Sequence, residues 1–351
     1  MDKIVEWFGE RTLKDRRKKI DAFWEGDRQC IVTVHSTEAH YRQNQNDDEV
    51  LELAPQNLKA QSELPGCNMP TFFADFGPIS TAKYWGGEMS YDEESENIYI
   101  EPAAESVEGA LELERRPVDD PQLDAARGVR LYRQLCDRLD TDNLWLRMPD
   151  TQGPLNTAGL VVNQTELLMA TRTEPENVHR LLDQITDFLI DYVRYCFEGA
   201  DGQVCGFIWP YTFFPAELGL SLTEDLMPLL SEASYREFGL PCLRRLAEEF
   251  GGLHIHCCGQ WGQHAETLAQ SELPIRAVEY HYPFTEIKEL VPLAPDAAFV
   301  PYISVDQQDE YDSQAEYYEH LLSDMDQDYR FWFAFGDDSE EAINFAEAHG
   351  F

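Results

Sequence analysis

The stretch LHIHCCG, residues 253–259, shows the pattern that decides the fold class. It is short and nearly continuously apolar, and Gly259 ends it, as expected of a β-strand that is covered on both faces. Seven further runs of this kind occur along the chain. They are residues 30–36, 69–75, 143–150, 203–210, 276–281, 297–304 and 330–335.

The segments between these runs have the apolar spacing of amphipathic helices. The clearest are residues 49–64, 175–199, 225–251 and 313–325. Eight strand–helix units in 351 residues predict a (β/α)₈ barrel of the TIM type. A doubly wound open sheet is the alternative because the same alternation builds it, but no GxGxxG motif follows the first run.

The barrel is predicted to form a single domain over residues 30–351, preceded by a helical extension at 1–29. Residues 86–118 contain an alternating stretch, and we expect them to form an inserted hairpin after the second strand, over the barrel mouth. No stretch reaches the roughly 18–20 uncharged apolar residues that cross a bilayer. The first residues lack an apolar signal core, so a cytoplasmic location is expected.

The formal net charge of −39 disfavours nucleic acids and anionic membranes as partners. Seven lysines stand against 20 arginines. This composition is typical of a protein adapted to high salt, where screening relieves self-repulsion, or simply of an acidic cytoplasmic enzyme. The eight cysteines are spread along the chain and do not form the dense framework of a disulfide-stapled domain.

Two cysteines, Cys257 and Cys258, stand in a chemically suggestive context. Side chains alternate along a strand, so His256 and Cys258 are expected to face the barrel mouth while Cys257 faces the helices. An imidazole and a thiolate two positions apart can supply two ligands to zinc. The alternative is a buried strand whose histidine and cysteine are ordinary core residues.

Active sites of such barrels lie at the C-terminal ends of the strands. Candidate catalytic residues at these ends are Asp75, Glu279 and His281. Candidate substrate-binding residues are His35, Gln152, Trp209, Tyr211 and Tyr302. Glu279 and His281 repeat the one-face spacing on the next strand, so both pairs together could form a four-ligand site. Each candidate also has a structural alternative. Glu279 could form a buried salt bridge, Asp75 could cap a helix, and Trp209 and Tyr211 could anchor a buried loop.

Three motifs occur in the order typical of one known family. They are DFGPIS (75–80), QGPLNTA (152–158) and the block EDLMPLLSEASYREFGLPCLRRL that leads into HIHCCG, at 224–259. From about Asp75 onward the chain therefore resembles the uroporphyrinogen decarboxylase superfamily. That superfamily also includes corrinoid- and coenzyme M-linked zinc methyltransferases, and the resemblance implies a (β/α)₈ barrel that often forms homodimers.

The resemblance implies that His256 and Cys258 match the first two zinc ligands of the methyltransferases. The third ligand matches Phe335, which cannot bind metal, and no cysteine follows Cys258. The candidates to replace it are Glu279, His281 and Asp337. On this hypothesis the chain transfers a methyl group from a corrinoid, carried by a separate protein, to a small-molecule thiol activated by zinc.

Two other functions remain open at this stage. Asp75 matches the decarboxylase aspartate that holds pyrrole nitrogens, which would suit a metal-free decarboxylase of a porphyrinogen-like or other carboxylated substrate. Against this, Arg42 is the only basic residue of 35–43, where the decarboxylases carry an arginine-rich segment. The third candidate is a barrel without catalysis that binds a small ligand.

Overall fold

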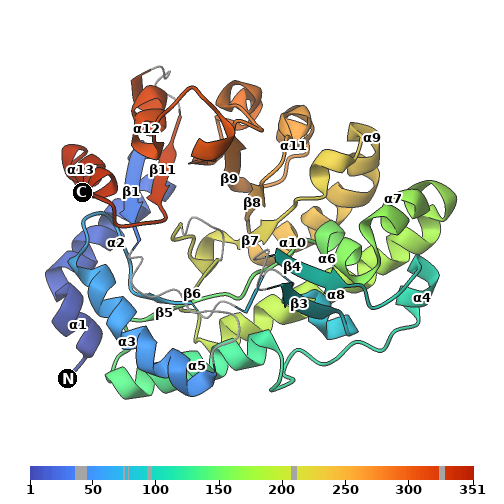
Figure 1. The fold of residues 1–351 in the computed structure, drawn as a ribbon, viewed down its shortest axis with the longest axis horizontal. Coiled ribbons are helices and arrows are strands. Elements are labelled where there is room, and N and C mark those ends of the chain that lie inside the picture. Colours follow the sequence, from blue (N-terminus) through green and yellow to red (C-terminus); the bar gives the residue numbers. More distant parts are fainter. Residues whose placement is uncertain (36–45, 74–75, 78, 93–96, 207–211, 324–328) are drawn as a thin grey trace.

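A computed structural model gives the fold of the chain (Figure 1). It describes all residues except 36–45, 74–75, 78, 93–96, 207–211 and 324–328. The strands that pair in parallel are β1 (Cys30–Val34), β2 (Thr71–Phe72), β5 (Trp145–Arg147), β6 (Val204–Cys205), β7 (Leu220–Thr223), β8 (Leu253–Cys257), β9 (Ile275–Tyr282), β10 (Ala298–Ile303) and β11 (Phe331–Phe335).

These strands form two parallel sheets. The larger has the order β1-β11-β10-β9-β8-β7, and the smaller has the order β2-β5-β6. The predicted α/β class with parallel strands is thus confirmed, and the first and last strands are neighbours over five residue pairs. Among the described residues no continuous ladder joins the two sheets. Isolated bridges join Thr33 of β1 to Gly66, which precedes β2, and Thr223 of β7 to Gln152, which follows β5.

Each of the eight predicted runs contains a strand, but β7 was not predicted. Its four residues, LSLT, are all buried and pair with β8. The run is too short to stand out from the loop before the expected helix. Because β7 precedes it, the strand that carries His256 is the sixth parallel strand in chain order among the described residues, where eight strands were expected and nine are found.

Helices fill the connections and lie outside the strands in Figure 1. They are α1 (Lys3–Phe8), α2 (Glu10–Trp24), α3 (Asp47–Glu63), α4 (Val107–Leu111), α5 (Asp124–Leu139), α6 (Pro154–Val161), α7 (Gln164–Thr173), α8 (Pro175–Gly199), α9 (Glu232–Ser234), α10 (Leu240–Phe250), α11 (Ala265–Ala269), α12 (Gln314–Ser323) and α13 (Glu340–Ala348). None of the helices in the described part of the chain is long and apolar enough to span a bilayer.

The helix predicted at 225–251 is interrupted. A 3₁₀ turn at Met227–Leu229 and a π-helical turn at Tyr235–Gly239 precede α10. Pro241, at the start of α10, has no N–H with which to continue an α-helical ladder, and a π turn accommodates the missing bond. The connection from β7 to β8 therefore begins with an irregular turn at 224–229, directly beside the end of β8.

The predicted inserted hairpin is present, although shorter than the segment 86–118. Strand β3 (Glu88–Asp92) pairs antiparallel with β4 (Asn97–Glu101). Residues 1–29 contain the helices α1 and α2. Phe23 of α2 is fully buried and meets the ring of Trp332 edge-on at 5.5 Å, so α2 packs into the same core as β11.

Candidate metal centre

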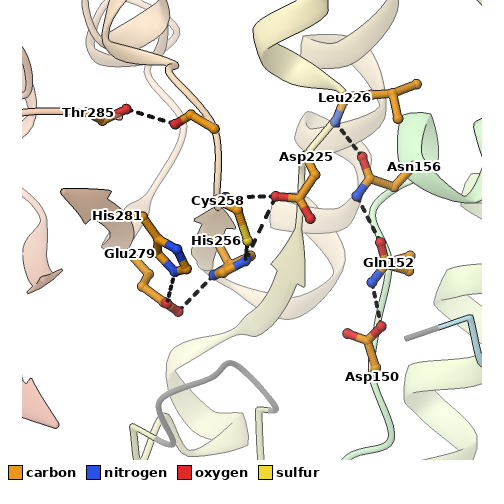
Figure 2. Close-up of polar contacts among 11 residues, drawn as sticks. Asp150, Gln152, Asn156, Asp225, Leu226, His256, Cys258, Glu279, His281 and Thr285 are labelled. Carbon is orange, nitrogen blue, oxygen red and sulfur yellow. Dashed lines mark hydrogen bonds and ion pairs between the residues drawn. The ribbon is translucent and has the colours of Figure 1, made fainter. Parts of the chain in front are cut away.

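The end of β8 and the end of β9 together bring three potential metal ligands into one cluster (Figure 2). One donor atom from each of His256, Cys258 and His281 lies within 4.8 Å of the other two. Nε2 of His256 is 3.0 Å from Sγ of Cys258, and the two imidazole rings are 5.3 Å apart. Among the described residues this is the one such group of three.

The β8–β9 register explains why these residues meet. His256 pairs with Glu279, so two positions further along both chains Cys258 comes level with His281. Cys257 points the other way and is fully buried in the apolar core, whereas Cys258 is exposed. The predicted period of two along this stretch is therefore confirmed. Burial raises the pKa of the Cys257 thiol well above its usual value of 9.0.

Glu279 lies beneath the two histidines and contacts both. Its Oε2 is 2.9 Å from Nδ1 of His256, and its Oε1 is 3.2 Å from Nε2 of His281. Burial alone would raise the pKa of Glu279, but the charge of His256 and the hydrogen bonds from both rings hold it below 4.5. Burial alone would lower the pKa of His256, but the Glu279 carboxylate holds it well above 6.5.

These contacts assign a role to each ring nitrogen. Nδ1 of His256 and Nε2 of His281 face the carboxylate, which leaves Nε2 of His256 and Nδ1 of His281 available to an ion. A carboxylate behind a metal-binding histidine fixes the ring orientation and tautomer. Of the three expected replacements for the missing ligand, His281 is the residue that joins the cluster, while Glu279 sits behind it.

Asp337, the remaining candidate ligand, lies elsewhere. Its Oδ1 accepts a hydrogen bond from the N–H of Ser339, which is the N-cap residue of α13. It lines a cleft of about 490 Å³ together with Tyr302, Phe335 and residues of the loop after β10. The ring of Tyr302 is 4.6 Å from that of His281, so this cleft adjoins the cluster.

The other predicted site residues divide into two groups. His35 follows β1, and its backbone N–H binds the carbonyl of Phe335. Gln152 is 7% exposed and bonds Asp150 and Asn156. Asp75, Trp209 and Tyr211 lie outside the described residues.

Two residues that the sequence did not indicate, Asp225 and Thr285, hold the loop that carries Cys258. Oδ1 of Asp225 accepts the Cys258 N–H at 2.7 Å and lies 3.8 Å from Nε2 of His256. On the other side, the buried Thr285 donates to the carbonyl of Gly259 and accepts the Trp261 N–H, while its own N–H binds the carbonyl of His281. Thr285 therefore ties the loop after β8 to the loop after β9.

Comparisons with known proteins agree with the motif resemblance. No protein-family model matches the sequence. A methylated-thiol--coenzyme M methyltransferase of Methanosarcina mazei is 30% identical over 125 residues, which are 35% of this chain and 30% of that relative's length. The match thus spans less than a third of the relative.

The solved structure of a methyltransferase from the same organism has this fold. It superposes with a TM-score of 0.65 over 96% of this chain and 97% of that chain, at 15% sequence identity. The chain is therefore similar in sequence, over about a third of its length, to a methylated-thiol--coenzyme M methyltransferase and shares the fold of a methyltransferase, in agreement with the resemblance of its motifs to the uroporphyrinogen decarboxylase superfamily.

Proposed function

We propose that the protein is a zinc-dependent methyltransferase whose metal is held by His256, Cys258 and His281. The observation that carries the proposal is the convergence of these three donors above the buried Glu279 carboxylate. When bound, zinc would lower the pKa of a coordinated thiol and so supply a thiolate nucleophile at neutral pH.

The donor set fits zinc. Thiolate and imidazole are the ligands that zinc takes in proteins, and three protein ligands with an open fourth position are the pattern of catalytic sites. His281 takes the place of a cysteine that the resemblance places at Phe335. An imidazole is neutral where a thiolate carries a charge, so this site would have one negative charge less than a site with two cysteines.

The protein residues have separate tasks in this scheme. Cys258 would bind as the thiolate. His256 would bind through Nε2 and must first lose the proton that its raised pKa favours in the absence of metal. Glu279 pairs with Nδ1 of His256 and hydrogen-bonds Nε2 of His281, and so orients both rings. Asp225 and Thr285 hold the loop on which Cys258 sits.

The substrates follow from the same proposal. The relative's name specifies a methylated thiol and coenzyme M, which supports a small thiol as a substrate here. The methyl donor would be a corrinoid on a separate protein, as the family resemblance implies. The cleft lined by Tyr302, whose ring contacts that of His281, is a space beside the proposed metal that could admit a small substrate.

The proposal also includes a closed barrel formed as one domain by residues 30–351. Three features support closure: the first and last strands pair, isolated bridges join the larger sheet to residues next to β2 and β5, and Cys205 of the smaller sheet shares a core with Val300 and Ala334 of the larger. Closure would place the ends of β5, β7, β8 and β9 around a single mouth.

Metal analysis tests the function directly. Protein purified without chelator or affinity metal should contain about one equivalent of zinc per chain. Cys258→Ser and His281→Ala should each lose most of it, and Cys257→Ala, the matched control one position away, should retain it. Zinc-free wild-type protein that also fails to take up added zinc, or full zinc content in Cys258→Ser, would overturn the proposal.

A further inference from the structure

A chain of buried side-chain amides runs from the end of β5 to the turn after β7 (Figure 2). The Leu226 N–H donates to Oδ1 of Asn156 at 2.8 Å, and Nδ2 of Asn156 donates to Oε1 of Gln152 at 2.8 Å. Nε2 of Gln152 in turn donates to Oδ2 of Asp150. The three side chains are between 3% and 7% exposed.

The donor-to-acceptor direction of these hydrogen bonds is fixed at both ends. The backbone N–H of Leu226 can only donate, and the carboxylate of Asp150 accepts from Gln152. Each amide must therefore present its oxygen toward Leu226 and its nitrogen toward Asp150. A group that cannot both accept and donate at position 156 or 152 would leave a buried polar atom unsatisfied, which costs more than an ordinary hydrogen bond contributes.

Leu226, to which Asn156 is hydrogen-bonded, belongs to the turn after β7, and this turn contacts the backbone of the metal cluster. Glu224 donates its N–H to the carbonyl of His256 at 2.8 Å, and Asp225 accepts the N–H of Cys258 at 2.7 Å. Leu226, the next residue, is the one that Asn156 holds. Two successive residues of this turn thus contact the backbone of two proposed ligands, and the third is anchored in the core.

The register shows why a side chain is needed here. Thr223 of β7 pairs with His256 of β8, so two positions further along the ladder residue 225 would lie opposite Cys258. The strand ends at Thr223, and the Asp225 carboxylate takes the place of a ladder carbonyl as the acceptor for the Cys258 N–H. Without it, the backbone of the exposed Cys258 loses its contact on the β7 side.

We propose that Asp225 is a positioning residue for the Cys258 ligand, and that Asn156 and Gln152 hold Asp225 in place by anchoring Leu226. This inference rests on the proposed metal site. It predicts that residues remote from the metal, on α6 and before it, set the metal affinity without contacting the ion. Substituting a residue that orients a metal ligand without contacting the ion typically lowers metal affinity by about 10- to 100-fold.

The test compares zinc dissociation constants, measured by competition with a chelator, in five proteins. Wild type is the reference. Asp225→Ala should bind zinc about 10- to 100-fold more weakly, whereas Asp225→Asn, whose amide oxygen can still accept the Cys258 N–H, should recover most of the loss. Asn156→Asp, which accepts from Leu226 but cannot donate to Gln152, should weaken zinc binding roughly tenfold. Asp337→Asn removes one negative charge from another strand end and should change little.

The cobalt-substituted proteins give a second readout. Asp225→Ala should alter the thiolate-to-cobalt charge-transfer band, because the sulfur is displaced, while the melting temperature of the metal-free protein stays near that of wild type. If wild type binds zinc through Cys258 and His281 but Asp225→Ala and Asn156→Asp bind it equally well, the positioning role is wrong and the metal site stands. If wild type binds no zinc, the proposed function itself fails.

Discussion

Oε2 of Glu279 lies 2.9 Å from Nδ1 of His256, and this contact determines which nitrogen of His256 faces the cluster. The carboxylate is completely buried, and its second oxygen is occupied by His281. One residue therefore orients both histidines of the proposed site. The same contact makes the stability of the metal-free protein depend on pH.

Glu279→Gln should destabilise the metal-free protein most between about pH 4.5 and 6.5. The raised pKa of His256 contributes stability that is fully present below 6.5 and is lost as the pH rises through its folded-state value. The lowered pKa of Glu279 contributes stability that is present above 4.5 and is lost as the pH falls through its folded-state value. Within this window the loss should be about 1.5–3 kcal/mol, the usual contribution of a hydrogen bond to a charged group.

Urea unfolding of wild type and Glu279→Gln across pH 4–9 measures this difference. Glu217→Gln, which removes an exposed partner of Arg17, is the control and should cost less than about 1 kcal/mol at every pH. If wild type and Glu279→Gln differ in free energy of unfolding by the same amount at every pH, Glu279 and His256 are not an ion pair.

Zinc affinity should fall as the pH is lowered. Both Cys258 and His256 must release a proton to bind the ion, and Glu279 makes that proton harder to remove from His256 by raising its pKa. In Glu279→Gln the decline should therefore begin at a lower pH, although the affinity at high pH is weaker because the rings are less well oriented. Chelator competition at a series of pH values gives both curves, and identical midpoints would contradict the assigned contact.

The neighbouring cysteines should differ in reactivity. Cys258 is exposed, so iodoacetamide should modify it rapidly once the metal has been removed, and slowly while zinc is bound. Cys257 is buried among apolar side chains, and its thiol has a raised pKa, so it should remain unmodified in the native protein with or without metal. Peptide mapping by mass spectrometry distinguishes the two, and preferential modification of Cys257 would contradict the described register.

Salt should stabilise the protein. The excess acidic side chains, which give a net charge of −39, repel one another. Raising the ionic strength from low to molar KCl shortens the screening length to about 3 Å and so weakens this repulsion. We expect the melting temperature to rise steadily over this range, with sodium chloride giving a similar curve. A melting temperature that stays flat would show that the acidic surface is not a source of instability.

The local pattern of β8 was enough to predict which of its side chains share a face. Alternation along a strand depends only on neighbouring residues, and the burial of Cys257 against the exposure of Cys258 follows from it. The third proposed ligand could not be chosen in the same way. Its identity depends on the pairing of β8 with β9, which places His281 level with Cys258 and places Glu279 two positions earlier, level with His256.

The supporting residues were missed for a related reason. In the sequence Asp225 is simply the first residue of the helix expected at 225–251. It accepts the Cys258 N–H because β7 ends at Thr223 and an irregular turn follows. Asn156 reads as an ordinary residue of α6, because nothing local shows that its oxygen meets a backbone N–H 70 positions away. Such contacts are set by the packing of distant segments.

X-ray absorption spectroscopy of the zinc-loaded protein tests the central claim most directly. Ligation by His256, Cys258 and His281 predicts one sulfur at about 2.3 Å and two imidazole nitrogens at about 2.0–2.1 Å, with a further light atom in the open position. Cys258→Ser should remove the sulfur shell, and His281→Ala should reduce the imidazole scattering. A spectrum with two or more sulfur ligands, or with none, would contradict the site described here.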